Sequence, residues 1–529
     1  MCRSPVIWSE FELADKGVNP MSDDVQVFFV GAGPGEPGLL TLRAVECLAI
    51  ADLIVHDRLV TARILDYAPA KVERICVADL PGSHPEKGEQ IHAILIEAAR
   101  TGRRVVRLKG GDPLLFARGG EEVEAVRAAG LSYEIVPGVT SGLAAAAFAG
   151  IPLTHRQYSS AVALVTGHED PAKPDNNLDW AALARFPGTL VVYMAMARLP
   201  QVVEALLKHG KAPTMPAAIV HWGSVGNQRT IEGPLESLAA AAQAVHLKAP
   251  SIVVVGDAVR MRAELAWFER RPLFGKHVVV TRPHSQAADF ARRLEKLGAV
   301  PHIMPMIEVG PPLDWSLVDK ALGELPSYQW LVFTSANGVH SLVRRLRETG
   351  RDLRALGAIK LAAIGPSTAE ALSTYYLNAD VVPPSFRSES LVDVLKERVA
   401  RQRVLLARAD QGREILHAEL SKVATVDQIA VYSQIEVMQP NDPTHELLRH
   451  GHIHFVTLTS SNIARVFARR LDEKSRAYIV SGRTKLVSIS PVTSETIRET
   501  GLTVAGEAPR YTSEGIIEVL LRMVRESSD

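Results

Sequence analysis

The sequence has few cysteines and no excess of charge of either sign. Its 529 residues include only three cysteines, Cys2, Cys47 and Cys76. These are too few and too scattered for a disulfide framework or a Cys-x-x-Cys metal site. Lys and Arg number 59, as do Asp and Glu, so no net charge attracts nucleic acid or an anionic membrane. Any acidic partner must therefore be held by local Arg and Lys side chains.

The sequence also lacks long apolar runs. The first two dozen residues contain no signal-peptide core, and the most apolar segment, 142–153, is too short to span a bilayer. We therefore expect a soluble, cytoplasmic protein that binds neither membrane nor nucleic acid. Because Met21 lies just before the first predicted strand, residues 1–24 are expected to be a disordered extension.

What the sequence does contain is an alternation of short apolar runs with segments of helical spacing. This alternation predicts an α/β fold with mostly parallel sheets. The predicted strands are 25–30, 53–56, 104–108, 133–136, 161–166, 189–194 and 251–256. A charged stretch near 269–276 separates two regions of different character. We predict a first domain at 25–265, a linker at 266–275 and a second domain at 276–525.

The second region contains an internal repeat with an offset of 125 residues. The matching pairs are FTSANGV (333–339) with LTSSNIA (458–464), 362–372 with 487–497, SESLVDVL (388–395) with SEGIIEVL (513–520), and, shifted by one, 278–282 with 404–408. The repeat predicts two related α/β lobes of about a hundred residues each, a usual domain size. We expect the lobes to face each other across a cleft, a favoured place for a ligand.

The first predicted strand leads into the turn VGAGPGEPG, which matches the G-x-G-x-x-G dinucleotide pattern. Asp57 follows about twenty residues later, where such sites place a ribose-binding acid. However, Pro34 and Pro37 have no N–H groups, so the loop is a poor cradle for a pyrophosphate. Three interpretations are open: the dinucleotide site of an oxidoreductase, a tight turn without ligand, or a loop bordering a nucleoside that carries no phosphates.

Five segments have the order and spacing of uroporphyrinogen-III C-methyltransferases, members of the tetrapyrrole methylase superfamily. They are VGAGPGEPGLLTLRA, DRLV (57–60), RLKGGDPLLFARGGEE (107–122), VPGVTSGLAAAAFAGIPLTHR (136–156) and VVYMA (191–195). The resemblance implies a fold of two subdomains and transfer of two methyl groups from S-adenosylmethionine to uroporphyrinogen III. The products would be S-adenosylhomocysteine and precorrin-2, a precursor of siroheme and cobalamin. It further implies a homodimer through this half and no metal.

Carried over residue by residue, the resemblance assigns individual roles. The cofactor residues would be Pro34, Gly110, Gly111, Asp112, Leu115, Thr140, Ser141, Met194 and Gly223. Arg118 would bind a substrate carboxylate, Glu121 would lie near a pyrrole ring, and Asp57 would accept the proton released after methyl transfer. The residues alone leave alternatives open: a turn cap for Asp112, strand-end core for Met194, a surface ion pair for Arg118 and Glu121, and an exposed strand-end acid for Asp57.

The sequence departs from this family at one position. Where relatives have VGKRAG, this chain has VADLPG (77–82), so Asp79 replaces a lysine to which a proton-donor role has been given. Either that role is dispensable or this protein fills it differently.

From residue 276 to about 525, the duplicated half resembles uroporphyrinogen-III synthases. The supporting segments are VVVTRP, FTSANGV, AIGPSTAEAL, LLARAD, VYSQ and SPVTSETIRETGL. The resemblance implies a two-lobed fold that closes linear hydroxymethylbilane to uroporphyrinogen III with one pyrrole inverted. Tyr432 is the candidate for assisting loss of the hydroxyl group, and a half-buried strand tyrosine is its alternative.

Six further residues are candidates for binding substrate carboxylates, through side chains and through backbone N–H groups at loop starts. They are Arg282, Ser335, Asn337, Arg408, Ser460 and Thr493. Arg282 and Arg408 end equivalent strands and would face the cleft, and surface solvation is the alternative for all six. The family's usual TSPS and IGP are TSSN (459–462) and SISP (488–491) here. A degenerate half that only binds its ligand, as a sensor would, is therefore an open alternative.

Overall fold

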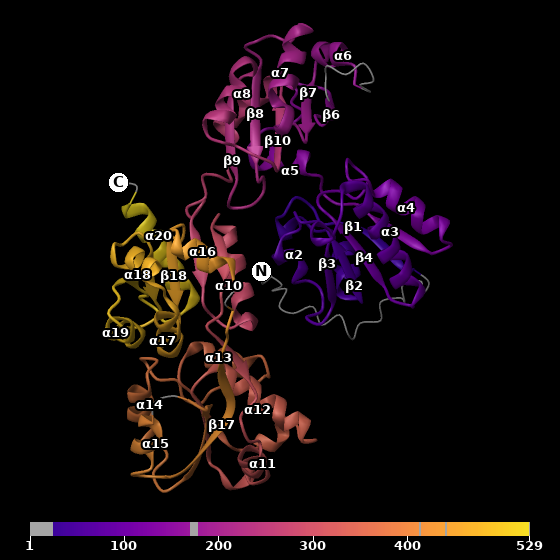
Figure 1. The fold of residues 1–529 in the computed structure, drawn as a ribbon. Coiled ribbons are helices and arrows are strands. Elements are labelled where there is room, and N and C mark those ends of the chain that lie inside the picture. The colour runs from indigo at the N-terminus through magenta and orange to yellow at the C-terminus, as the bar shows by residue number, and fades with distance from the viewer. Residues whose placement is uncertain (1–24, 170–177, 412–413, 440–441, 528–529) are drawn as a thin grey trace. The chain divides into compact units, whose positions relative to one another are not determined.

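The computed structural model describes residues 25–169, 178–411, 414–439 and 442–527 (Figure 1). The expected N-terminal extension, residues 1–24, lies outside the described residues. The chain divides into two compact units, Met1–Arg271 and Pro272–Asp529, called units 1 and 2 below.

Unit 1 begins with a five-stranded sheet in the order β3-β2-β4-β1-β5, in which every pairing is parallel. Its strands are β1 (Val27–Gly31), β2 (Leu53–His56), β3 (Glu73–Cys76), β4 (Val105–Lys109) and β5 (Tyr133–Val136). The helices that connect them are α1 (Leu42–Ala49), α2 (Ala62–Leu65), α3 (His84–Arg100) and α4 (Gly119–Ala128). Because the strands are parallel, their carboxyl ends meet at one edge, where ligand-binding loops gather in such sheets.

The second sheet of unit 1 has the order β6-β7-β10-β8-β9, and only β6 and β7 pair in parallel. Its strands are β6 (Val162–Thr166), β7 (Thr189–Tyr193), β8 (Pro216–His221), β9 (Arg229–Pro234) and β10 (Ser251–Val255). Its helices are α5 (Ser141–Phe148), α6 (Trp180–Arg185), α7 (Leu199–Lys208), α8 (Leu235–Ala244) and α9 (Arg262–Leu265). The seven predicted strands are confirmed, but the prediction of mostly parallel pairing is wrong for this sheet. The β8–β9 connection is too short for a crossover helix, so these strands pair antiparallel.

Unit 2 contains two more five-stranded sheets, which define lobes A and B. Lobe A has the order β12-β11-β18-β19-β20, and lobe B has the order β13-β17-β16-β14-β15. The strands of lobe A are β11 (His277–Val280), β12 (Val300–Ile303), β18 (Phe455–Leu458), β19 (Lys485–Ser488) and β20 (Val504–Glu507). Those of lobe B are β13 (Ile307–Gly310), β14 (Trp330–Phe333), β15 (Lys360–Ala363), β16 (Arg403–Ala409) and β17 (Thr425–Glu436).

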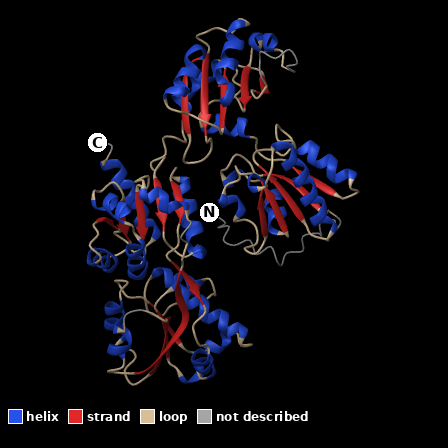
Figure 2. Ribbon diagram, viewed as in Figure 1, coloured by secondary structure: helices blue, strands red, loops and turns tan. Residues whose placement is uncertain are grey.

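Helices connect the strands in both lobes, with α17 and α18 between β18 and β19 where lobe B has α12 between β14 and β15. Lobe A has α10 (His284–Lys296), α16 (Pro443–Arg449), α17 (Ser461–Arg470), α18 (Glu473–Val480), α19 (Pro491–Glu499) and α20 (Ser513–Glu526). Lobe B has α11 (Ser316–Gly323), α12 (Ala336–Glu348), α13 (Pro366–Ser373), α14 (Ser388–Leu395) and α15 (Ile415–Leu420). In Figure 2 the red strands of lobe B are flanked by blue helices.

The two sequence repeats do not coincide with the two lobes. β14 and β15 recur as β18 and β19, yet the chain leaves lobe A after β12, forms lobe B and returns after β17 (Figure 1). Each lobe therefore contains strands of both repeats, which corrects the expectation of one lobe for each repeat. In lobe A β11 pairs with β18, and in lobe B its counterpart β16 pairs with β14. β14 and β18 are equivalent strands of the two repeats. The sequence pattern therefore does not show whether β11 pairs with the strand of its own repeat, β14, or with that of the other repeat, β18.

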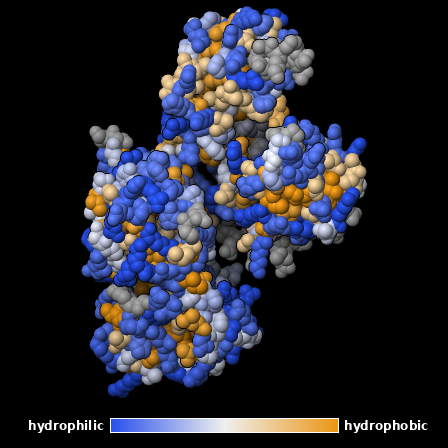
Figure 3. Space-filling model, viewed as in Figure 1, coloured by the Kyte–Doolittle hydropathy of each residue, from blue (hydrophilic) through white to orange (hydrophobic). Residues whose placement is uncertain are grey.

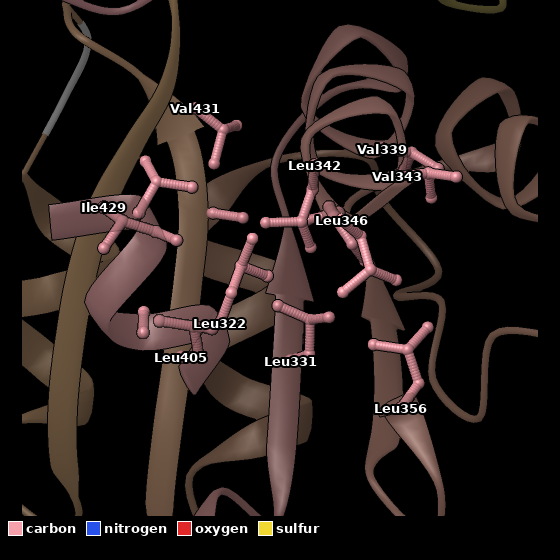
Figure 4. Close-up of a cluster of buried hydrophobic side chains, with 14 of the residues drawn as sticks. Leu322, Leu331, Val339, Leu342, Val343, Leu346, Leu356, Leu405, Ile429 and Val431 are labelled. Carbon is pink, nitrogen blue, oxygen red and sulfur yellow. The ribbon is translucent and has the colours of Figure 1, made fainter. Parts of the chain in front are cut away.

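The core of lobe B shows why its strands are apolar on both faces. Leu342 and Leu346 of α12 point toward the strands that carry Leu331 and Leu405, and all four side chains are buried (Figure 4). The neighbouring strand residue Trp330 lies in a second buried cluster on the other face of the sheet. Continuous apolar strands of this kind are expected where helices cover both faces of a sheet.

Residues 266–275, predicted as a linker, pack onto the units on either side of them. Trp267 Nε1 donates to Ala147 O at 3.0 Å, and Phe268 is buried. Leu273 is fully buried in a core cluster of lobe A. The division between the units therefore falls at Arg271–Pro272, with little free chain between them.

Among the residues that the structure covers, no helix has the length and apolarity needed to cross a membrane. On the face drawn in Figure 3, hydrophobic residues form small scattered groups among hydrophilic ones.

Candidate active sites

Three glycine-containing loops touch at the carboxyl edge of the first sheet of unit 1. Gly33 N donates to Gly111 O at 3.1 Å, and Gly111 N donates to Gly33 O at 2.7 Å. A Cβ on Gly31 would lie 2.5 Å from Gly138 N and 2.7 Å from Gly111 O. No side chain fits at such distances, so the glycines let the three backbones approach one another.

The first of these loops uses its own amides. The N–H groups of Gly38, Leu39 and Leu40 donate to acceptors on Glu36 and Pro37 at 3.0–3.2 Å. The helix α1 starts only beyond these residues. A pyrophosphate needs free N–H groups at a helix N-terminus, so the geometry disfavours the dinucleotide interpretation.

Asp112 fastens the second loop to the third. Its Oδ1 accepts from Leu114 N at 2.9 Å and from Leu115 N at 3.1 Å, and its Oδ2 accepts from Gly138 N at 3.2 Å. These bonds match the turn-cap interpretation. A contact between Asp112 and a cofactor stays a prediction.

The N-terminus of α5 is fastened to the end of β7 by a residue that the sequence analysis missed. Tyr193 OH lies 2.8 Å from Thr140 Oγ1 and accepts from Gly142 N at 3.0 Å. The ring is buried, and this burial raises the pKa of the Tyr193 phenol. Its place beside Met194 in VVYMA was the only sequence signal. Thr140 and Ser141 are thereby held next to the end of β7.

Met194 does not lie in the core, because the residue is 47 % exposed. A Cβ on Gly223 would lie 2.6 Å from Ala145 Cβ, so this glycine permits close approach to α5. Five non-glycine residues in these loops have positive φ angles: Phe116, Arg118, Met194, Trp222 and Ser224. Strained backbone of this kind gathers at functional sites. The contacts of Asp112, Tyr193 and Gly223 thus link the loops that carry the predicted cofactor residues.

A buried network of charges lies beneath Asp57. Arg107 Nη2 lies 2.7 Å from Asp57 Oδ1, and Gly110 N donates to Asp57 Oδ2 at 3.2 Å. Arg107 also makes two hydrogen bonds of 3.1 Å to Glu122, and Lys109 Nζ lies 2.8 Å from Glu122 Oε1. Two cations thus face two carboxylates, as buried charges require.

The network fixes Asp57 in place. Arg107, Lys109 and Glu122 are nearly inaccessible to solvent, and burial lowers the pKa of the Lys109 ammonium. The Asp57 side chain is 30 % exposed, so it reaches the surface of the site from this buried support. These three residues were not predicted as site residues, although RLKGGDP places two basic residues in an otherwise buried strand. The role of Asp57 as a base stays a prediction.

Arg118 and Glu121 form a long ion pair of 4.0 Å, with side chains 60 % and 64 % exposed. This matches the surface ion pair that the residues alone allowed, and their substrate contacts stay predictions. Asp79 is also exposed, in the turn after β3. Lys87 Nζ of α3 donates to Ala78 O at 2.7 Å, which brings an ammonium group to the segment where Asp79 replaces the lysine.

In unit 2, Tyr432 is fully buried rather than half-buried. Its hydroxyl lies 3.0 Å from Ser335 Oγ, which also accepts from Gly338 N at the start of α12. Asn337 Oδ1 accepts from Gln286 Nε2 of lobe A at 2.7 Å. The structure thus brings Tyr432, Ser335 and Asn337 together where the lobes touch.

Arg408 lines a cavity of about 200 Å³ at the carboxyl edge of the lobe B sheet. Tyr432, Thr334, Ile364 and Ser388 also line it. Arg408 is buried, and its Nη1 lies 2.8 Å from Glu414 Oε1. Two sequence-predicted residues therefore share one cavity, and one of them is already paired with an acid.

Arg282 occupies the equivalent strand end in lobe A. Its Nη1 donates to Ser513 Oγ at 2.8 Å, and its guanidinium lies 4.9 Å from the centre of the Phe290 ring. Burial lowers the pKa of Arg282 to about 10. Ser460 Oγ accepts from Ile463 N at 3.2 Å and caps α17, as Ser335 caps α12.

Thr493 is not at a loop start, which corrects the prediction. It lies inside α19, is buried, and its hydroxyl is 3.1 Å from Ser490 Oγ. Ser490 is the residue that caps the helix, and the sequence analysis missed it. Thr493 is buried because it lies inside α19, which begins at Pro491 as its repeat counterpart α13 begins at Pro366. Asn337 likewise lies inside α12 and not at a loop start, which corrects the prediction for that residue as well.

Two family models match the chain, one in each unit. Residues 26–239 match "Tetrapyrrole (Corrin/Porphyrin) Methylases", and residues 288–518 match "Uroporphyrinogen-III synthase HemD". The "Porphyrin biosynthesis protein HemD" of Ruminiclostridium josui is 35 % identical over 445 residues, which are 83 % of this chain and 88 % of the relative.

Two further similar proteins each match less than half of the chain. An "S-adenosyl-L-methionine-dependent uroporphyrinogen III methyltransferase" of Methanosarcina barkeri is 47 % identical over 236 residues, 45 % of this chain and 92 % of the relative. A solved uroporphyrin-III C-methyl transferase of Thermus thermophilus, complexed with S-adenyl homocysteine, is 38 % identical with a TM-score of 0.38. The match covers 44 % of this chain and 99 % of the solved chain.

The chain therefore belongs to the family that joins a tetrapyrrole methylase to a uroporphyrinogen-III synthase. It is a bifunctional enzyme of tetrapyrrole biosynthesis, with the methyltransferase in unit 1 and the synthase in unit 2.

Proposed function

We propose that unit 2 closes hydroxymethylbilane to uroporphyrinogen III and that unit 1 methylates this product twice to precorrin-2. The observation that carries the proposal is the presence of both family matches in one chain. The product of the second unit is the substrate of the first. Precorrin-2 would then leave toward siroheme or cobalamin.

We propose S-adenosylmethionine as the cofactor of unit 1, bound by the nine residues carried over above. This cofactor supplies an activated methyl group and carries no phosphate. The glycine loops suit it because their backbones touch one another and their amides are largely used within the chain. Methyl transfer to carbon needs donor and acceptor held close and in line. The fastening of these loops by Asp112 and Tyr193 supports that requirement.

Asp57 is the proposed acceptor for the proton that leaves the methylated ring carbon. Arg107 and Gly110 hold both of its oxygens, so its orientation is fixed before substrate binds. Arg118 and Glu121 are exposed on the same loop-to-helix segment and would contact the substrate's carboxylates and ring. Preorganisation of this kind supports proton transfer at a fixed atom.

In unit 2 we propose Tyr432 as the group that assists loss of the hydroxyl from hydroxymethylbilane. Burial raises the pKa of its phenol, so the phenol keeps its proton and can donate it to the departing oxygen. Ser335 holds the phenol oxygen at 3.0 Å. The remaining task of the unit is to fold the linear substrate for closure with one ring inverted.

The decisive experiment uses the intact chain without oxygen. Given hydroxymethylbilane and S-adenosylmethionine, it should yield precorrin-2, and without S-adenosylmethionine it should stop at uroporphyrinogen III. Release of only the spontaneous type I isomer, or of its methylated products, would contradict the synthase assignment and favour a binding-only second half. Tight binding of NAD without binding of S-adenosylmethionine would contradict the methyltransferase assignment.

We also propose a homodimer through unit 1, as the family resemblance implies. Sedimentation at micromolar concentration should then give twice the chain mass of 57.4 kDa. A species of single-chain mass would count against the dimer.

A further inference from the structure

The loop that carries Gly223 has a backbone conformation that neighbouring contacts must hold. Trp222 and Ser224, on either side of this glycine, have φ angles of 46° and 78°, and Ser224 is fully buried. Such angles cost free energy and persist only where the surrounding structure fixes them. A Cβ on Gly35 would also lie 3.2 Å from Val225 Cγ1, so this loop borders the first glycine loop. The loop therefore needs support to keep its place in the proposed cofactor site.

Gln228 supplies that support from a buried position. The residue is 2 % exposed, and its Oε1 accepts from Ser224 N at 2.9 Å. Its Nε2 donates to Phe148 O at 3.3 Å and to Glu269 Oε1 at 2.8 Å. Phe148 is the last residue of α5, the helix that begins at Ser141. One side-chain amide thus joins the strained loop, the end of α5 and the segment that leads toward unit 2.

Glu269 in turn holds Gln228. Its Oε1 also accepts from Thr230 Oγ1 at 2.5 Å, and its Oε2 lies 2.7 Å from Arg262 Nη2. The side chains of Arg262 and Glu269 are only 13 % and 19 % exposed. Because the ion pair is largely shielded from water, salt screens it little. Glu269 is therefore a fixed acceptor for the Gln228 amide.

The rest of the segment 262–271 packs against the same end of α5. The centre of the Phe268 ring lies 4.8 Å from that of Phe148, and Phe268 is buried. A Cβ on Gly150 would lie 2.5 Å from Ala266 N, so no side chain fits between the segment and the turn after α5. All of these residues belong to unit 1. The segment is thus a packed part of the methyltransferase unit.

We propose that Gln228 and Glu269 are positioning residues of the methyltransferase: Gln228 holds the loop that carries Gly223 in its binding form, and Glu269 holds Gln228. The inference rests on the proposed S-adenosylmethionine site and adds two residues that act through the loop. When the binding form of a loop is populated only in part, the apparent affinity for its ligand falls by that fraction. Loss of the support should therefore weaken cofactor binding without changing the reacting groups.

The test measures binding of S-adenosylhomocysteine to the full chain by titration calorimetry. Gln228→Leu keeps a side chain of similar size but removes the acceptor of Ser224 N. Its Kd should rise about tenfold, within the range that the loss of a buried hydrogen bond produces. Glu269→Ala should raise Kd by about threefold, because Gln228 keeps its bonds to Ser224 and Phe148.

Methylation kinetics separate positioning from a general loss of activity. The KM for S-adenosylmethionine should rise in both variants, whereas the KM for uroporphyrinogen III should not change. Glu269→Gln should recover most of the affinity, because its side-chain oxygen can still accept from Gln228 Nε2. Formation of uroporphyrinogen III should be the same in every variant, since both residues lie in unit 1.

Leu238→Val is the matched control for stability. Leu238 of α8 is 1 % exposed and lies in a core cluster of the second sheet of unit 1. A smaller side chain there should lower the temperature of unfolding. It removes no hydrogen bond of the loop, so the Kd of the folded protein should not change. Gln201→Leu, at an exposed position of α7, controls for the type of substitution and should also keep its Kd.

The outcomes are distinct. If the unmodified chain does not bind S-adenosylhomocysteine, the proposed cofactor fails rather than the positioning role. If it binds, and folded Gln228→Leu changes Kd no more than Leu238→Val does, the positioning role is wrong. A rise in Kd for Gln228→Leu and Glu269→Ala, with recovery in Glu269→Gln, supports it. If Gln228→Leu does not fold, as judged by circular dichroism, an unchanged Kd in Glu269→Ala overturns the role instead.

Discussion

The two units hold their candidate sites by different means. In unit 1, three loops of one sheet edge touch at glycine backbones, and buried charges support Asp57 from below. In unit 2, the candidate residues are divided between two sheets, and most of them cap helices or pair through side chains. The candidate site of unit 1 therefore depends on close backbone contacts at glycines, which leave no room for an added atom. The candidate site of unit 2 depends instead on the side chains that the two lobes contribute.

The difference fits the chemistry proposed for each unit. Methyl transfer joins two atoms along one line, so its rate depends on a short, fixed separation. Ring closure must instead gather distant parts of a long, flexible substrate. Substitutions that add volume should thus damage unit 1 most, and substitutions that remove polar groups should damage unit 2 gradually.

The largest effect is expected from Gly138→Ala. The new Cβ would lie 2.3 Å from Gly111 O, so the loops of unit 1 must separate. Methyl transfer should fall by roughly a hundredfold, because small misplacements in a reactive pair have effects of that size, while synthase activity persists. Gly88→Ala, which meets no atom within 4 Å in α3, is the matched control and should keep both activities. Equal loss of both activities would contradict the contrast between the units.

Glu122→Gln should be nearly as damaging to the stability of unit 1. It leaves Arg107 and Lys109 buried with Asp57 as their remaining nearby anion. Breaking a buried ion pair costs about 3–5 kcal/mol, which urea unfolding of the chain would measure. Glu124→Gln on the exposed face of α4 should change the free energy of unfolding by less than about 0.5 kcal/mol. Similar values for the two variants would show that the network is not needed.

Acid should destabilise unit 2 through three neighbouring histidines of lobe A. His277 Nδ1 lies 2.9 Å from His302 Nε2, and His277 N donates to His454 Nδ1 at 3.0 Å. Burial lowers the pKa of His302 and of His454 to about 4 each. The charged groups that act on these imidazoles are Asp442 for His302, and Lys276 and Arg483 for His454.

The sign of the effect follows from these pKa values. The neutral histidines stabilise the fold fully above the unfolded value of about 6.5, and this stability is lost as pH falls toward 4. For His302 alone the loss is about 3 kcal/mol. Thermal unfolding between pH 7 and 4 should show this loss, and His302→Gln should flatten the dependence. A dependence that the substitution leaves unchanged would assign it to other groups.

The smallest effects are expected from a matched pair of buried tyrosines. Tyr193→Phe leaves Gly142 N without its acceptor, and an unsatisfied buried donor costs about 1–3 kcal/mol. Tyr432→Phe loses the bond to Ser335, which still accepts from Gly338 N, so the cost should be nearer 1 kcal/mol. Methyl transfer should suffer only in the first variant and ring closure only in the second. Crossed effects would contradict the assignment of one site to each unit.

Much of the architecture could be predicted from local patterns. Seven of the ten described strands of unit 1 were predicted because each is a short apolar run bounded by turn residues, whereas β3, β8 and β9 were not predicted. The glycine loops could be recognised because Gly31, Gly111 and Gly138 lie in segments rich in glycine and proline that follow predicted strands. The repeated serines at helix starts could be placed because they precede periodic apolar residues. Ser335 and Ser460 indeed cap α12 and α17.

Contacts between distant residues could not be predicted in this way. Arg107 and Glu122 are 15 positions apart on a strand and a helix, and no local periodicity joins them. Tyr193 meets the start of α5 only because α5 packs on the second sheet of unit 1, although Thr140 and Tyr193 are 53 positions apart in the chain. The antiparallel pairing of β8 with β9 was not predicted, because the alternation of strands and helices led us to expect mostly parallel pairing in both sheets of unit 1.

Local sequence patterns are sufficient to predict most strands of unit 1, the repeat, and the residue types that the two families place at their sites. They do not show which strands share a sheet, and in the folded chain each lobe contains strands of both repeats. They also do not show that Arg408 pairs with Glu414 at 2.8 Å whereas Arg282 donates to Ser513. The physical reason is that periodicity and turn chemistry act over a few residues. Ion pairing and burial instead depend on groups that only the folded chain brings within reach of each other.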